Sequence, residues 1–161
     1  MYKRALVPLD GSEIAETIIP FLIEIAGPLD MSVVLLRVLE PQPAVAVDGS
    51  SAALLEDVEA RLKDASEYLA PLAVGLRARG IDVECLVRHG QPVSDKILAV
   101  AHEAGADLIA MTTHGRTGLG RLLFGSVAEA VLREAHIPVF LLRQTEAEMA
   151  KRQRKVKEAI R

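Results

Sequence analysis

Cysteine and aromatic side chains are scarce in this chain of 161 residues. The single cysteine, Cys85, excludes a disulfide framework and a multi-cysteine zinc or iron–sulfur site, and it is typical of a reducing compartment. Aromatic residues make up only 3% of the chain and Trp is absent, whereas 50% of the residues are hydrophobic. A core of Val, Leu, Ile and Ala predicts strands that helices cover on both faces. Cys85 falls within one such strand, so we expect a buried and unreactive thiol.

Long apolar runs are missing as well. Although the mean hydropathy is +0.26, no stretch approaches the roughly 18 to 20 uninterrupted apolar residues of a membrane span. Residues 1–4 lead straight into a strand-like run, without the apolar segment of a secretory signal. We therefore expect a cytoplasmic protein with no membrane segment.

The charge of the chain is unevenly distributed. Residues 144–161 contain six basic and three acidic residues, so this segment carries +3 and residues 1–143 carry −6 of the total of −3. This contrast predicts one domain over residues 1–143 and a basic tail over residues 144–161, which forms either a surface helix or a disordered segment. An acidic body argues against nucleic acid as a partner, because Lys and Arg supply most of the affinity for phosphates.

Apolar runs alternate with helical patterns along the chain. We expect strands at residues 5–9, 32–39, 81–88, 107–111 and 138–142, and helices at residues 13–26, 53–79, 93–103 and 127–135. Pro20 should produce a kink or a local break in the first helix and Gly27-Pro28 should end it, while Pro71 should weaken the second half of the next helix. The alternation predicts an α/β fold: an open, doubly wound, five-stranded parallel sheet of order 3-2-1-4-5, with helices on both faces.

Ligands of such sheets bind beyond the carboxyl ends of the strands, where the strand order reverses. The loops after the first and fourth strands, residues 8–12 and 112–126, are therefore the candidate site. The second loop is rich in Gly, Arg and hydroxyl residues and delivers Gly125-Ser126 to a helix N-terminus, which favours phosphate. An equally favoured alternative is that its glycines serve only to permit an irregular turn and that Ser126 is an ordinary N-cap. The order of the glycines fits neither a dinucleotide fingerprint nor a P-loop.

Several of these segments carry a family resemblance. The runs Leu6–Glu13, Gly90-Gln91-Pro92 and Thr113–Gly118, continued by Leu123–Ala128, closely resemble the universal stress protein family, and the likeness covers about residues 3–143. ATP-binding members share the motif G-x2-G-x9-G-[ST]. Gly115 and Gly125-Ser126 match its second part, whereas Thr112 stands at its first glycine, with a Cβ and a hydroxyl where the backbone passes close to the ligand.

The resemblance implies a nucleotide site. In it, Asp10 would bond the ribose or the edge of adenine, although alone it reads as an Asx-turn residue. The implied binding residues are Pro8, Leu9, Asp10, Val38, Met111, Thr112, His114, Gly115, Arg116, Gly125, Ser126 and Val127. Pro8, Leu9, Val38 and Met111 would surround the base. The phosphates would be held by His114, Gly115, Gly125, Ser126 and Val127, and Arg116 could approach them too. The implied ligand is ATP, or ADP or AMP, with Mg²⁺ or Mn²⁺ bound through phosphate oxygens and water.

The main functional hypothesis is a stress-response protein that binds ATP as a regulatory ligand and acts through partners. One alternative is a slow ATP-hydrolysing or adenylyl-transferring enzyme, and another is a ligand-free interaction protein whose pocket Thr112 closes. A hydrolase triad of Ser12 or Ser126 with His114 and Asp10 is disfavoured, because no G-x-S-x-G elbow is present. We expect a homodimer through the apolar strand at residues 138–142, unless the tail folds back over that edge.

Overall fold

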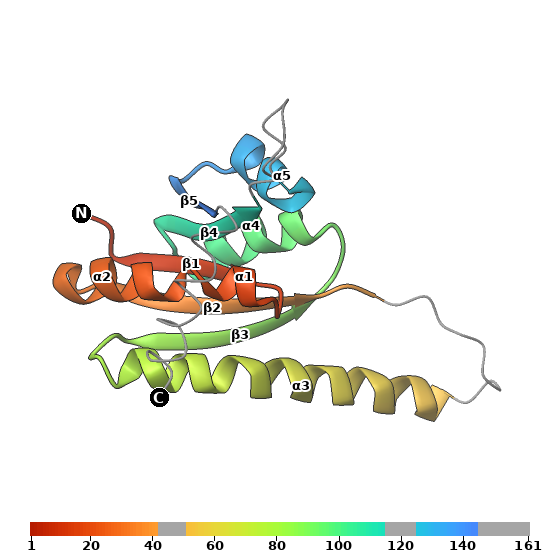
Figure 1. The fold of residues 1–161 in the computed structure, drawn as a ribbon. Helices are drawn as coiled ribbons and strands as arrows, with labels where there is room; N and C mark the ends of the chain where they lie inside the picture. The colour runs from red at the N-terminus through yellow and green to blue at the C-terminus, as the bar shows by residue number, and fades with distance from the viewer. Residues whose placement is uncertain (42–50, 115–124, 145–161) are drawn as a thin grey trace.

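Strands and helices alternate in the order that the sequence predicts (Figure 1). A computed structural model describes residues 1–41, 51–114 and 125–144. Its elements are β1 (Arg4–Leu9), α1 (Glu13–Glu16), α2 (Ile19–Leu29), β2 (Ser32–Leu39), α3 (Ser51–Arg77), β3 (Val83–His89), α4 (Val93–Glu103), β4 (Leu108–His114), α5 (Ser126–Glu134) and β5 (Val139–Gln144). All five strands run parallel in the order β3-β2-β1-β4-β5, which confirms the predicted fold class.

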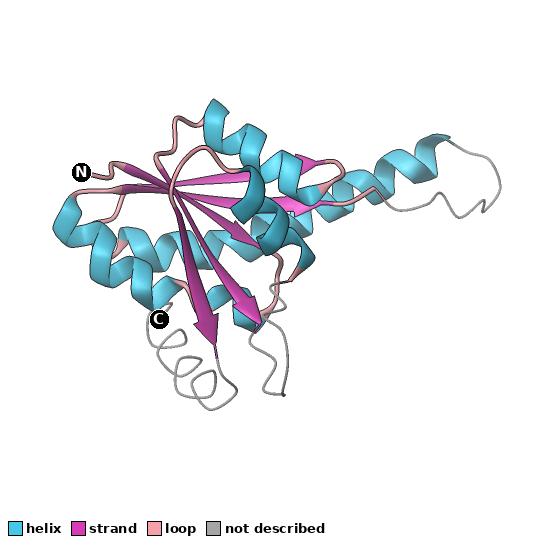
Figure 2. Cartoon of the chain, turned by 90° about the horizontal axis from the view of Figure 1, so that it is seen from above, coloured by secondary structure: helices cyan, strands magenta, loops and turns pink. Residues whose placement is uncertain are grey.

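Helices cover both faces of the sheet (Figure 2), so the strands contribute to two separate cores. Alternate residues of β1 point to opposite faces: Ala5, Val7 and Leu9 pack against α1, α2 and α3, whereas Leu6 packs against α4 and α5. The central strands are almost continuously apolar because both of their faces are buried. Among the described helices, none is long and apolar enough to cross a membrane.

The helix predicted over residues 13–26 is in fact two helices. The hydroxyl of Ser12 caps α1 by accepting the N–H of Ala15 at 3.1 Å. The helix is then interrupted at Thr17 and Ile18, before α2 begins. Pro20 lies in the first turn of α2, where its missing N–H leaves no hydrogen bond unmade. The prediction that Gly27-Pro28 ends the helix was wrong: α2 continues to Leu29 and ends at Asp30, whose φ of 51° is left-handed.

The long helix α3 and the neighbouring strand β3 contain two further departures. Helix α3 is unbroken through Pro71, because Leu69, Leu72 and Leu76 on its inner face are all buried in the core and hold the second half in place. The expected burial of Cys85 was wrong, and its side chain is exposed. It belongs to β3, an edge strand that has a neighbouring strand on one side only.

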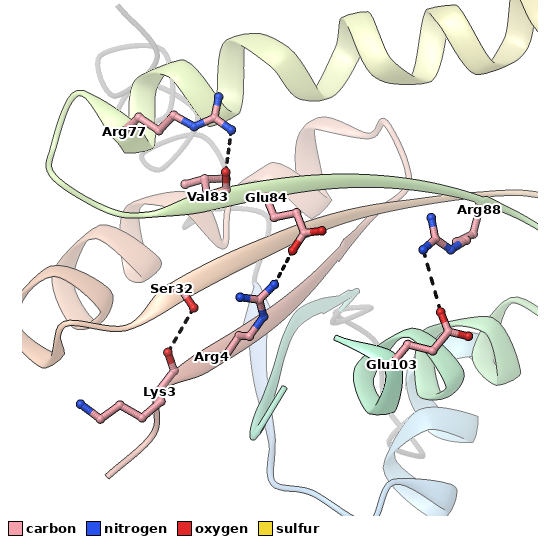
Figure 3. A network of polar contacts seen from close by, with 8 residues as sticks. All are labelled: Lys3, Arg4, Ser32, Arg77, Val83, Glu84, Arg88 and Glu103. Atoms are coloured by element: carbon pink, nitrogen blue, oxygen red, sulfur yellow. Dashed lines mark hydrogen bonds and ion pairs between the residues drawn. The ribbon is translucent and has the colours of Figure 1, made fainter. Parts of the chain in front are cut away.

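Arginine side chains cap the free edge of β3, and Figure 3 shows the contact from Arg77 to the carbonyl of Val83. The N–H of Val33 donates to the carbonyl of Asp82, so the alternation of the ladder points the carbonyls of Val83 and Val87 away from β2. Arg77 donates to the first carbonyl at 2.5 Å and Arg88 donates to the second at 3.2 Å. Two of the outward backbone acceptors of this edge are therefore already satisfied.

Strand β1 is joined unequally to its two neighbours. It pairs with β2 at six positions but with β4 only at Ala5 and Leu6. Below that short seam, the carboxylate of Asp107 accepts the N–H groups of Lys3 at 2.8 Å and Arg4 at 3.0 Å. Beyond it comes Pro8, whose position in the alternation would point an N–H toward β4. Proline has no N–H, so it cannot extend this ladder, and the seam between β1 and β4 ends before Pro8.

Candidate functional site

A cavity of about 320 Å³ opens where β1 and β4 part, at the carboxyl edge of the sheet. Residues from β1, β2, β4, α1, α4 and α5, and from the loops that follow the first two strands, line it. The lining consists of Pro8, Leu9, Asp10, Ser12, Ile14, Ala15, Leu36, Arg37, Val38, Glu40, Val93, Ile97, Met111, Thr112, Thr113, Gly125, Ser126, Val127 and Ala128. The cavity thus lies at the predicted reversal of strand order.

One wall of the cavity is apolar. Val38 of β2 and Met111 of β4 are only 8% and 7% exposed, and they share a hydrophobic cluster with Ile97 of α4. Val93, at the start of α4, packs against the same cluster and also lines the cavity. Aliphatic and thioether groups arranged in this way form a surface that suits a flat, apolar ring.

Asp10 lies in the loop between β1 and α1 and lines the cavity. Its Oδ1 accepts the N–H of Ser12 at 2.9 Å, which is the Asx turn that the alternative interpretation expected. The turn leaves further acceptor positions of the Asp10 carboxylate available, because its two oxygens offer about four such positions. Asp10 is exposed, so its remaining acceptor positions can serve hydroxyl donors of a ligand.

The N-terminus of α5 forms another part of the wall. Gly125, not Ser126, is the N-cap, and its N–H donates to the hydroxyl of Thr113 at 3.4 Å. The next residues, Ser126 and Val127, begin the helix, and N–H groups in a first turn have no acceptor within the helix. A Cβ placed on Gly125 would meet no described atom within 4 Å, so this surface is open to an anion.

The structure gathers most of the implied binding residues around this cavity. Thr112 is half-buried and contributes to the lining, and the cavity keeps its volume with this side chain in place. His114 is the last residue of β4, but its side chain lies outside the described part of the chain. Gly115 and Arg116 also lie outside the described residues.

Sequence reasoning missed several lining residues. Val93 and Ile97 stand one helical turn apart on α4, so their periodicity could have identified them once α4 was assigned to this face. Thr113 could not be found in this way, because its role is a hydrogen bond to the N-cap of a helix that begins thirteen residues later. Glu40 follows the end of β2, and no motif distinguishes it.

Behind the first loop, Glu16 of α1 faces Tyr68 of α3. Burial raises the pKa of the Glu16 carboxyl, the Tyr68 hydroxyl acts to lower it, and the negative charges of Glu13 and Asp10 raise it further. Burial also raises the pKa of Tyr68, and the neighbouring Glu16 adds to that increase. Asp10, Glu13 and Glu16 thus form an acidic group at the first loop, and the positive charge of Arg37 acts on the same region.

No metal cluster is formed by the described side chains. Within residues 1–41, 57–113 and 125–143, no group of three or more His, Cys, Asp or Glu side chains converges on a possible metal position. The hydroxyl of Ser12 accepts a backbone N–H as a helix cap. The chemistry of this part of the cavity is that of binding: an apolar wall, a carboxylate and a helix N-terminus.

Comparisons with known proteins agree with this architecture. The model of the universal stress protein family matches residues 1–143. A universal stress protein of Methanocaldococcus jannaschii is 31% identical over 150 residues, which cover 92% of this chain and 86% of that protein.

Solved structures share the fold as well. The structure of another M. jannaschii protein superimposes with a TM-score of 0.68 at 25% identity, covering 91% of this chain and 99% of that one. An Arabidopsis thaliana universal stress protein family member, solved with AMP bound, has a TM-score of 0.64 at 18% identity, covering 91% and 94% of the two chains. Because the family model matches residues 1–143 and a family member is 31% identical, the chain belongs to the universal stress protein family.

Proposed function

We propose that this chain binds an adenine nucleotide, ATP foremost and ADP or AMP as alternatives, as a regulatory ligand. The observation that carries the proposal is the cavity at the open seam, which combines an apolar wall with a helix N-terminus. A nucleotide needs both, because its base is flat and its phosphates are anionic. The AMP-bound structure of the Arabidopsis family member supports the choice of an adenine ligand.

The cavity suggests how the ligand lies. The base fits between Val38 and Met111, the ribose hydroxyls reach Asp10, and the phosphates meet the first turn of α5. Mg²⁺ or Mn²⁺ would arrive with the nucleotide, held by phosphate oxygens and water, because the described side chains offer no acidic cluster of their own. The proposed binding set also keeps His114, Gly115 and Arg116, on the family resemblance.

The proposal favours binding over turnover. A ligand-free protein with a pocket closed by Thr112 is disfavoured, because the cavity is open with Thr112 in its wall. The expected cytoplasmic location suits a ligand drawn from the intracellular nucleotide pool, and it suits a chain with one thiol.

Mass measurement of nucleotide released from freshly purified, denatured protein tests the proposal. We expect an adenine nucleotide in the released fraction. Calorimetric titration of nucleotide-free protein should then give a dissociation constant for ATP or ADP in the micromolar to low millimolar range. No binding at millimolar ligand defeats the proposal, and rapid release of inorganic phosphate from bound ATP would favour the enzyme instead.

We also propose that two chains pair through the outer edge of β5, with residues 144–161 following as a basic tail. The N–H of Ile109 donates to the carbonyl of Pro138, so the backbone groups of Val139, Leu141 and Arg143 point away from β4. The apolar side chains of this strand are only half-buried. An antiparallel pair about a two-fold axis would satisfy both rows of backbone groups.

The variant Leu141→Pro tests this pairing. It removes an outward N–H that the β4–β5 ladder does not use, so the fold should survive while the dimer is lost. Phe140 is a poorer choice, because it stacks on Phe21 within the chain, with ring centroids 4.0 Å apart. The matched control is Cys85→Pro, which makes the same change on the outer edge of β3. Light scattering should give twice 17.4 kDa for the unmodified chain and the control, and a monomeric unmodified chain would contradict the pairing.

A further inference from the structure

We propose that Glu40 selects the nucleobase, by accepting a hydrogen bond from the exocyclic amine at the outer edge of the ring. This inference rests on the proposed nucleotide function and goes beyond it, because it assigns recognition of the amine to one side chain. Glu40 lies directly after Leu39, the last residue of β2, and it lines the cavity two residues beyond Val38.

Contacts from two other elements hold Glu40 at the mouth of the cavity. Arg61 of α3 donates from Nη2 to the backbone carbonyl of Glu40 at 2.8 Å. Gln91, which precedes α4, donates from Nε2 to Oε2 of the Glu40 carboxylate at 3.3 Å. Both the backbone and the side chain of an exposed residue are thus oriented before any ligand arrives, which lowers the entropic cost of using it.

The strand order gives the cavity a direction. Glu40 follows β2, Asp10 follows β1, and Gly125 is bonded to Thr113 of β4, so three polar groups stand in a row along β2, β1 and β4. Neighbouring strands lie about 4.8 Å apart, so this row extends over roughly 10 Å. A base, a ribose and a phosphate follow one another over a similar length, which places the base at the β2 end, against Val38 and beside Glu40.

The chemistry of Glu40 then determines which base fits. An ionised carboxylate only accepts hydrogen bonds, and the contact from Gln91 leaves most of its acceptor positions available. An exocyclic amine at the ring edge donates to such a group, and a hydrogen bond to a charged acceptor is stronger than a neutral one. A ring with only C–H at that position would desolvate the carboxylate without replacing its lost hydrogen bond.

A cycle of two ligands and two proteins isolates this contact. The ligands are ATP and purine riboside 5′-triphosphate, which lacks only the exocyclic amine, and the proteins are the unmodified chain and Glu40→Ala. We expect the unmodified chain to prefer ATP by about three- to tenfold, in line with the net worth of one hydrogen bond. Glu40→Ala should bind the two ligands equally, with its affinity for the purine triphosphate within about twofold of the original.

Three further variants sharpen the test. Glu40→Gln keeps an acceptor of the same shape and should retain a reduced preference for ATP. Gln91→Ala removes the positioning contact and should lower the preference without abolishing it. Glu59→Ala, an exposed carboxylate of α3 away from the cavity, should change nothing. Equal binding of both ligands by the unmodified chain, or a preference that survives in Glu40→Ala, overturns the inference while the proposed function stands. Absence of binding for both ligands overturns the two together.

Discussion

The two seams that flank β1 differ in length, and the difference locates the site. The seam with β2 is paired at six positions from Arg4 to Leu9, whereas the seam with β4 is paired only at Ala5 and Leu6. The same strand thus closes one side of the sheet and opens the other. The cavity lies on the open side, so the short ladder and the reversal of strand order coincide at this crevice.

We expect the largest loss of ATP affinity from a substitution at the N-terminus of α5, the helix that borders the open seam. Gly125→Val places a branched side chain on the surface of α5 that faces the cavity, and we expect at least about a 100-fold loss of ATP affinity, because more than one phosphate contact is blocked. Thermal stability should fall by no more than about 1 kcal/mol, since the site has open space and only N-cap preference is lost. Gly27→Val, in open space on α2, is the matched control, and a comparable loss of affinity there would refute the assignment.

Pro8 lacks the N–H that would extend the seam between β1 and β4, so we expect its replacement to lengthen that seam. In Pro8→Ala, the restored N–H can donate toward β4, and we expect the cavity to narrow and ATP affinity to fall by about three- to tenfold. Hydrogen exchange measured by NMR should show protection of the new amide at position 8. An amide that exchanges freely would mean that β1 and β4 part for another reason.

Thr112 tests the facing side of the same crevice. Thr112→Gly removes a half-buried side chain from the cavity wall and supplies the glycine of the family motif, so we expect ATP affinity to rise by about threefold. The flexibility of glycine within β4 should cost about 1 kcal/mol of stability. Ala110→Gly makes a similar backbone change in β4 away from the cavity lining, and it should lose stability without any gain in affinity. Calorimetry and thermal unfolding measure both quantities.

The smallest expected effect is a change in stability, and it concerns α1, the helix that follows β1 in the chain. Because the pKa of Glu16 is raised in the folded protein, folding favours its protonated form, and its ionised form costs stability near neutral pH. Glu16→Gln should therefore be more stable than the unmodified chain at about pH 7, by less than about 1 kcal/mol for this half-buried group. The gain should vanish as the pH falls below the ordinary value of 4.5, where Glu16 is protonated. Urea unfolding of both proteins, with Glu24→Gln as the exposed control, measures it.

The sequence predicted the order of the elements because each strand is an apolar run and each helix has clear periodicity. It did not predict where some helices end or continue. Burial of Leu69 and Leu76 holds α3 together across Pro71, and that stabilisation exists only once the sheet has formed. Likewise, the exposure of Cys85 follows from the edge position of β3, which depends on the order of strands and not on the local pattern.

The candidate site was also predicted only in part, because some of its features depend on contacts between distant segments. Motifs after the first and fourth strands identified Asp10 and Gly125, which lie within single segments of the chain. The effect of Pro8 was not visible, because it depends on which neighbour its missing N–H would face, and this is fixed by the register of three strands. Glu40 was missed because its position depends on contacts from Arg61 of α3 and from Gln91.

The arginine caps on β3 have a consequence for how many chains can join. A sheet with two open edges can add further copies at either side and grow into a filament, whereas a sheet with one open edge stops growing once that edge is paired. Arg77 and Arg88 already donate to two outward carbonyls of β3, so after the proposed pairing at β5 the far edges of the dimer offer fewer backbone acceptors to a further copy. Two side chains remote from the cavity thereby favour a closed assembly over an open-ended one.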